Sequence, residues 1–71
     1  MTLLNLLYFL KNTNSNFKNI AIYKINIAHE IIFKYNIMFY LNDTDFYILK
    51  DYLNCPIKEC ITNDKSAIII L

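Results

Sequence analysis

Large apolar side chains occupy every second position from residue 31 to residue 41, namely Ile31, Phe33, Tyr35, Ile37, Phe39 and Leu41. A period of two is the pattern of a β-strand with one buried face, and it is the cleanest periodicity in the chain. The opposite face of this strand carries Glu30, Lys34 and Asn36. We therefore expect a sheet in which this strand is covered on one side and meets solvent or a polar partner on the other.

A helix is expected near the first residue of the chain. Four leucines recur there at the spacing of one helix face: Leu3, Leu6, Leu7 and Leu10. Thr2 can cap the start of this helix, and Lys11 suits its C-terminal end. The polar residues 12–16 that follow predict a loop.

A further strand is expected over residues 17–28, which are rich in Ile and Tyr and alternate in part. The alternation slips near Ile22 and Tyr23, which indicates a bulge or a strand that is covered on both faces. The polar residues 42–45 predict a turn.

Residues 46–53 fit two predictions. Their aromatic and isoleucine content favours a strand. A helix fits as well, because Asp43 or Thr44 could cap it and four residues would share one face: Phe46, Leu49, Lys50 and Leu53. Pro56 ends whichever element forms.

Residues 64–71 predict a final helix or strand that finishes on four apolar residues: Ile68, Ile69, Ile70 and Leu71. Such an apolar end is typical of a chain that is cut off or that docks, so we predict a partner interface at these four residues. The elements together predict an α+β fold, with an N-terminal helix packed on a small, mainly antiparallel sheet of about three strands. Residues 1–71 would form a single small domain or a domain fragment.

The length and the hydrophobicity of the chain predict a partner. A chain of 71 residues buries a small fraction of its surface and is only marginally stable alone. Yet 56% of its residues are hydrophobic, and apolar surface that cannot be buried internally usually meets a partner. The longest stretches without a charge are about ten residues, half of what a membrane-spanning helix needs, so no transmembrane segment is expected.

Glycine and arginine are absent, and Ile, Asn, Lys, Tyr and Phe fill 41 of the 71 positions. These residues have A- and T-rich codons, which indicates an AT-rich genome. A Walker loop, a dinucleotide fingerprint and a calcium-binding loop all need glycine, so the chain lacks these sites. With a net charge of +1 and no cluster of Lys, we expect no direct nucleic-acid binding.

The cysteines and the histidine have spacings that do not favour a metal or redox site. Cys55 and Cys60 are separated by four residues, whereas zinc and redox motifs prefer two. His29 would bring the number of ligand candidates to three, one fewer than a closed structural zinc site requires. We therefore expect two buried or idle thiols and no bound metal.

The carboxylates likewise predict no catalytic group. Glu30 stands beside His29, but no nucleophile or acid partner is placed near this pair by spacing. Asp43 and Asp45 in the expected turn could touch a cation, but they are too few for a calcium site. We expect no catalytic residue, no cofactor and no metal ligand.

Several short motifs follow one another in the order that is found in one protein family. A leucine-rich helix at residues 3–11 precedes an Asn/Thr turn and a phenylalanine, at Thr13, Asn14 and Phe17. A strand then opens with an acidic residue, two aliphatic residues and an aromatic residue, at Glu30, Ile31, Ile32 and Phe33. A Lys-x-Tyr motif follows at Lys50 and Tyr52.

The most specific of these motifs is a Pro-Ile pair followed nine residues later by Lys-Ser-Ala, at Pro56, Ile57, Lys65, Ser66 and Ala67. In this order the chain resembles the N-terminal α+β part of the NuoC-type subunit of respiratory complex I, the NADH:ubiquinone oxidoreductase. Residues 46–53 would then be a strand. The Glu-Arg-Glu signature of the family would follow Ala67, so the resemblance implies a shortened or split version, with the signature missing or carried by a second chain.

The resemblance implies a scaffolding role in mitochondria. Subunits of this family belong to the peripheral arm, on the matrix side of the inner membrane, and hold no cofactor of their own. The chain would then be a structural subunit of complex I that is not an enzyme by itself and that binds other subunits.

Three other functions remain open at the level of the sequence. The first is a small accessory protein of another large assembly, such as an organellar ribosome. The second is a small viral or mobile-element protein that binds a host protein. The third is a thiol redox role for Cys55 and Cys60.

Overall fold

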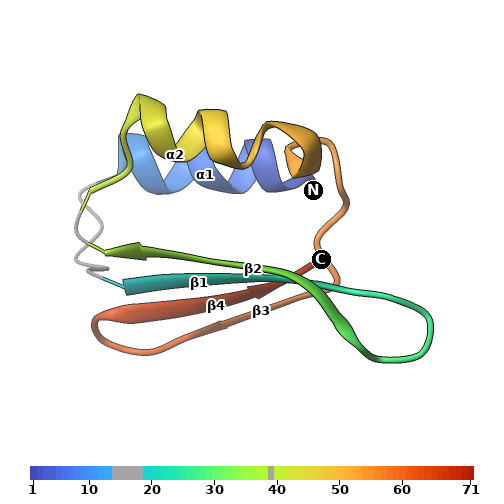
Figure 1. Ribbon diagram of the computed structural model, residues 1–71. Coiled ribbons are helices and arrows are strands. Elements are labelled where there is room, and N and C mark those ends of the chain that lie inside the picture. Colours follow the sequence, from blue (N-terminus) through green and yellow to red (C-terminus); the bar gives the residue numbers. More distant parts are fainter. Residues whose placement is uncertain (14–18, 39) are drawn as a thin grey trace.

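The computed structural model describes residues 1–13, 19–38 and 40–71 of the chain. The elements follow in the order α1 (Leu3–Asn12), β1 (Asn19–Ile25), β2 (Ile31–Met38), α2 (Asp43–Ile48), the 3-10 turn η1 (Lys50–Tyr52), β3 (Glu59–Thr62) and β4 (Ser66–Ile70). They form two layers, with α1, α2 and η1 together on one face of the sheet (Figure 1).

The sheet has four strands in the order β2-β1-β4-β3. The β1–β2 and β3–β4 pairs are antiparallel, and the central β1–β4 pair is parallel. The expected α+β class is therefore confirmed, with four strands in place of about three. The segment at residues 64–71, which fitted a helix or a strand, supplies β4.

Thr2 caps the start of α1, as the sequence predicted, and Asn5 completes the cap. The Thr2 hydroxyl accepts a hydrogen bond from the Asn5 backbone N–H, and the Asn5 side chain accepts one from the Thr2 backbone N–H. Other backbone N–H groups of the first turn reach carbonyls later in the chain, Leu3 to Cys55 at 3.0 Å and Leu4 to Leu53 at 2.9 Å. Because the first N–H groups of a helix lack partners within it, these bonds fix the start of α1 against the segment after η1.

The alternation of β2 has the predicted consequence for burial over residues 33–37, whereas Ile31, which was expected on the covered side, is 58% exposed at the bulge of the strand. Ile37 is buried and Phe33 and Tyr35 are part-buried on the helix side, whereas Lys34 and Asn36 are exposed on the other side. The Phe33 ring stacks on the Tyr52 ring of η1, with 4.2 Å between centroids. The strand ends at Met38, Leu41 lies beyond it, and Phe39 lies outside the described residues.

The bulge that was expected in the first strand, near Ile22 and Tyr23, lies in β2 instead. The β1–β2 register shifts after the pair Lys24–Phe33, because the next pair is Ile25–Ile31 and Ile32 is left over. The extra residue is therefore in β2, not near Ile22 and Tyr23 of β1. Residues 17 and 18 of the expected strand lie outside the described residues, and β1 ends at Ile25 rather than at residue 28.

Residues 46–53 are helical, so the strand that the complex I resemblance implies for them is wrong. Asn42 caps α2, accepting a hydrogen bond from the Asp45 backbone N–H at 3.0 Å, while the Asp45 carboxylate accepts from the Asn42 N–H at 2.9 Å. This reciprocal cap satisfies two backbone donors and starts a helix. Leu49 is then fully buried in the core between the two layers.

The turn between β1 and β2 requires a left-handed residue, and a histidine supplies it. His29 has φ 61° and is the one described residue with a positive φ. Its N–H bonds the Asn26 carbonyl at 3.0 Å, and the Asn26 N–H bonds the Glu30 carbonyl at 3.0 Å. A three-residue hairpin loop of this form usually places glycine at the left-handed position, and this chain contains none.

We expect His29→Gly to raise the free energy of unfolding by about 1 kcal/mol, because glycine adopts a positive φ without the clash that a Cβ atom causes. Urea unfolding measures the change, provided that the variant and the wild type have the same m-value. The matched control is Ala28→Gly, which should lower stability by about 0.5–1 kcal/mol, since Ala28 does not need that conformation. Equal losses from both substitutions would contradict the assigned strain at His29.

Candidate functional site

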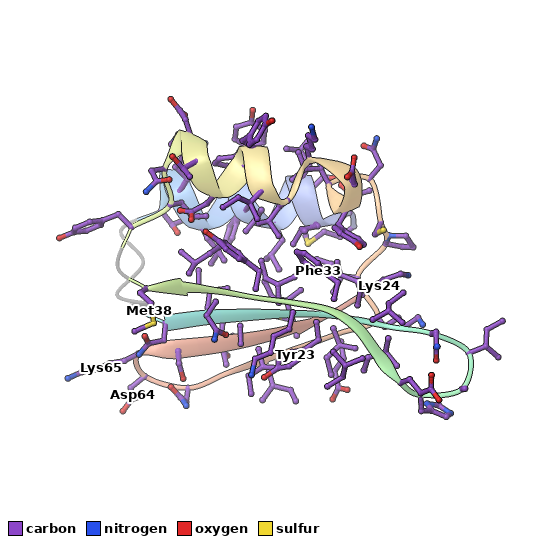
Figure 2. All side chains as sticks on the ribbon, viewed as in Figure 1. Tyr23, Lys24, Phe33, Met38, Asp64 and Lys65 are labelled. Atoms are coloured by element: carbon purple, nitrogen blue, oxygen red, sulfur yellow. The ribbon has the colours of Figure 1, made fainter. Side chains whose placement is uncertain are left out.

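The strongest candidate for a functional surface is the side of the sheet that faces away from the helices. The described helices all lie on the other side (Figure 1). We call this surface the open face and define it by the outward residues of the four strands: Asn19, Ala21, Tyr23, Lys34, Asn36, Met38, Glu59, Ile61, Ser66, Ile68 and Ile70. Figure 2 shows Tyr23 on this side and Phe33 between the sheet and the helices.

The strand register arranges the open face in rows that run across the sheet. One row is Lys34–Tyr23–Ile70–Glu59, from the β2 edge to the β3 edge. The next row is Asn36–Ala21–Ile68–Ile61, and the third contains Met38, Asn19 and Ser66. The first row therefore places a base at one edge, an acid at the other, and an aromatic and an aliphatic side chain between them.

The apolar residues of the open face are accessible to a partner. Met38 is 56% exposed, Ile61 48% and Ile68 39%. Ile31 and Ile32, at the bulge of β2, are also exposed. Monomeric soluble proteins seldom leave apolar side chains gathered in this way, and such patches usually mark interaction sites.

A shallow hollow of about 370 Å³ lies across one end of the sheet and includes outward and inward residues of three strands: Asn19, Ile20, Ala21, Asn36, Ile37, Met38, Ser66, Ala67 and Ile68. Ala21 lies in the middle of this set on the open face, between Asn36 and Ile68 in its row. Its methyl group leaves room there, because every neighbour in the row has a larger side chain.

A cation lies over an aromatic ring on the same face. The Lys34 Nζ is 5.5 Å from the centroid of the Tyr23 ring. A cation at this distance is attracted by the ring, and such a contact stabilises by about 0.5–1 kcal/mol at an exposed site. The lysine therefore leans over the open face instead of pointing away from the sheet edge.

The four residues predicted as a partner interface divide between the two faces of the sheet. Ile69 and Leu71 have 0% exposure and belong to the core, so they stabilise the fold itself. The Leu71 N–H also bonds the Tyr23 carbonyl at 2.8 Å. Only Ile68 and Ile70 of the four lie on the open face, where a partner can reach them.

Sequence reasoning did not single out Ala21, Tyr23 or Ile61. The partial alternation of residues 17–28 carried a signal for the first two, because Ile20 and Ile22 are the buried residues of that strand. Pairing was still needed to show that β1 is central and that its second face is open. Ile61 belongs to β3, a strand that was not predicted at all.

The polar candidates from the sequence are not assembled into one site. Cys55 is part-buried after η1, and Cys60 is exposed on β3. His29 lies in the β1–β2 turn, where Asn26 rather than His29 bonds the Glu30 side chain, at 3.3 Å. Among the described residues no three His, Cys, Asp or Glu side chains are close enough to hold a metal ion.

Asp45 is the one described charged residue that is buried, and it has a structural role. Its two carboxylate oxygens accept hydrogen bonds from the Tyr35 hydroxyl at 2.7 Å and from the Asn42 backbone N–H at 2.9 Å. The hydrogen bond to Asp45 raises the pKa of Tyr35, and burial and the negative charge of the carboxylate raise it further. This contact ties the cap of α2 to β2, at a distance of ten residues in the sequence.

None of the helices in the described part of the chain is long and apolar enough to span a bilayer. Comparisons with protein-family models, with curated proteins and with solved structures found no match for this chain.

We expect Tyr35→Phe to cost about 1–2 kcal/mol of stability at pH 7, because it leaves a buried carboxylate oxygen without its donor. Because the folded pKa of Tyr35 is raised, the contribution of this bond is complete below the ordinary tyrosine pKa of about 10 and is lost as the pH rises through the folded value. Denaturant unfolding at pH 7 to 11 should therefore show the wild type and Tyr35→Phe converging at the alkaline end.

Tyr47→Phe is the control, because it removes a hydroxyl from an exposed ring and should change stability by less than about 0.5 kcal/mol. A constant difference between wild type and Tyr35→Phe at every pH would contradict the linkage of this hydroxyl to Asp45.

Proposed function

We propose that this chain is a non-catalytic structural subunit that binds other protein chains within a large assembly. The observation that carries the proposal is the one-sided covering of the sheet, which leaves the apolar centre of the open face to a partner. A protein surface is the fitting partner, because the face is apolar in its middle and charged only at its edges.

The chemistry of the described residues supports a structural role over an enzymatic one. The buried carboxylate of Asp45 is occupied by a cap and a tyrosine, and the two cysteines and the histidine are spread over three segments. A reaction would need a nucleophile, an acid or a base held within hydrogen-bond reach of one another in a cleft.

We further propose that the assembly is the peripheral arm of respiratory complex I, on the matrix side of the mitochondrial inner membrane. The support is the order of motifs that ends in Pro56, Ile57, Lys65, Ser66 and Ala67. The helix and the strand that the resemblance implies for residues 3–11 and 30–33 have counterparts in α1 and β2. The helical α2 and η1 at residues 46–53 are the departure from it.

Native gel electrophoresis of organelles that contain the tagged chain tests this function. We expect the chain to migrate with the band that stains for NADH dehydrogenase activity. Ile68→Lys should remove the chain from that band by at least about tenfold, because a charge buried in an apolar interface without a partner costs several kcal/mol.

Ile27→Lys is the matched control, since Ile27 is 99% exposed at the tip of the β1–β2 turn and outside the open face. It should leave the migration unchanged. Migration of the wild-type chain with a ribosome, or with no large particle, would refute the complex I assignment.

A further inference from the structure

We propose that the open face is covered by a second copy of this chain, so that the protein is a two-fold symmetric dimer with its two sheets packed face to face. This inference names the partner of the surface on which the proposed structural role rests. The geometry points to it because the rows of the open face are complementary to themselves under one specific rotation.

The rotation is a half-turn about an axis that runs parallel to the strands, between the two central strands, in the plane of contact. It turns the sheet over and exchanges its edges, so that β2 of one copy lies over β3 of the other. With the strand order β2-β1-β4-β3, β1 of one copy then lies over β4 of the other. A two-fold interface needs such self-complementarity, because the same patch serves both copies.

The charges at the two edges fit this arrangement. Lys34 and Glu59 stand at opposite ends of one row, so the rotation places Lys34 of each copy across from Glu59 of the other. Both side chains are exposed, and Lys34 already leans over the face. Packed sheets lie about 10 Å apart, a gap that a lysine and a glutamate reaching from opposite sides can span.

The shapes in the middle of the face also fit. In the second row the rotation places Ile68 of one copy across from Ala21 of the other, where the hollow of about 370 Å³ lies. In the first row it places Tyr23 across from Ile70. Large side chains thus meet small or flat ones, as in the interior of a β-sandwich, whose sheets pack with their strands within about 30° of each other.

The polar residues of the open face lie where they can pair with each other or stay in contact with water. Asn19 and Ser66 face each other in the third row, and amide and hydroxyl groups can pair there. Asn36 meets Ile61 close to the sheet edges, where the amide keeps access to water. A four-stranded face about 20 Å wide is at the small end of specific interfaces, so we expect a dissociation constant in the micromolar range.

Sedimentation equilibrium of the purified chain, over roughly 1–500 µM at low and moderate salt, tests the dimer. We expect a reversible association between one and two times the chain mass of 8.5 kDa. Lys34→Glu alone and Glu59→Lys alone should each weaken it by at least about tenfold, because each places two like-charge pairs in the interface. The double variant K34E/E59K restores opposite charges and should return to within about threefold of the wild type.

The controls reverse one negative and one positive charge that lie outside the open face. Asp64 and Lys65 lie together in the turn between β3 and β4, at the end of the sheet (Figure 2). Asp64→Lys and Lys65→Glu should change the association by less than about threefold. Circular dichroism and thermal unfolding confirm that each variant is folded, which is expected because all four side chains are exposed.

Ala21→Phe provides a second, independent variant. It fills the hollow opposite Ile68 and should abolish the dimer, while its side chain points away from the core and leaves the monomer folded. A monomer throughout the concentration range, a larger polydisperse species, or a double variant as weak as its singles would overturn the dimer. A monomer that still migrates with NADH dehydrogenase activity would assign the open face to a different protein and leave the proposed function standing.

Discussion

Ile22 and Ile69 are register partners in the parallel β1–β4 pair, and neither exposes any surface to solvent. This pair joins two antiparallel hairpins into one sheet, β2 with β1 on one side and β4 with β3 on the other. Parallel neighbours need a long crossover, and here residues 26–65, which contain β2, α2, η1 and β3, provide it. α2 and η1 therefore lie over the sheet for a topological reason, and together with α1 they cover the core.

The same crossover decides which face of the sheet is left open. α1 and residues 43–52 together cover one side, with the buried leucines of α1 and Leu49 in the core and the Tyr52 ring on Phe33. No further described element remains for the second side. An 8.5 kDa chain with two layers can close one interface internally, and the apolar side chains on the other side of the sheet stay uncovered. The proposed structural role and the proposed dimer both follow from this limit.

The sequence predicted those elements that nearby residues determine, and it failed where tertiary packing decides. The helix at Leu3 to Leu10 and the alternation over residues 33–37 were predicted correctly, because a cap and a period can be read within a few residues. Residues 46–53 could not be assigned, because helix and strand both fitted their pattern and the burial of Leu49 between the layers decides between them; the cap is Asn42 and not Asp43 or Thr44. The interface predicted at the apolar end stays a prediction for Ile68 and Ile70, which face outward, whereas Ile69 and Leu71 alternate into the core.

The sequence by itself determined the local elements and excluded the sites that need glycine. It also determined that a left-handed turn would have to use another residue, which is His29. Only the tertiary structure decided that β1 and β4 are neighbours, and with that the row that sets Lys34 and Glu59 at opposite edges of one face. The physical reason is that periodicity fixes which residues share a face of one strand, whereas strand order depends on which crossover buries the most apolar surface.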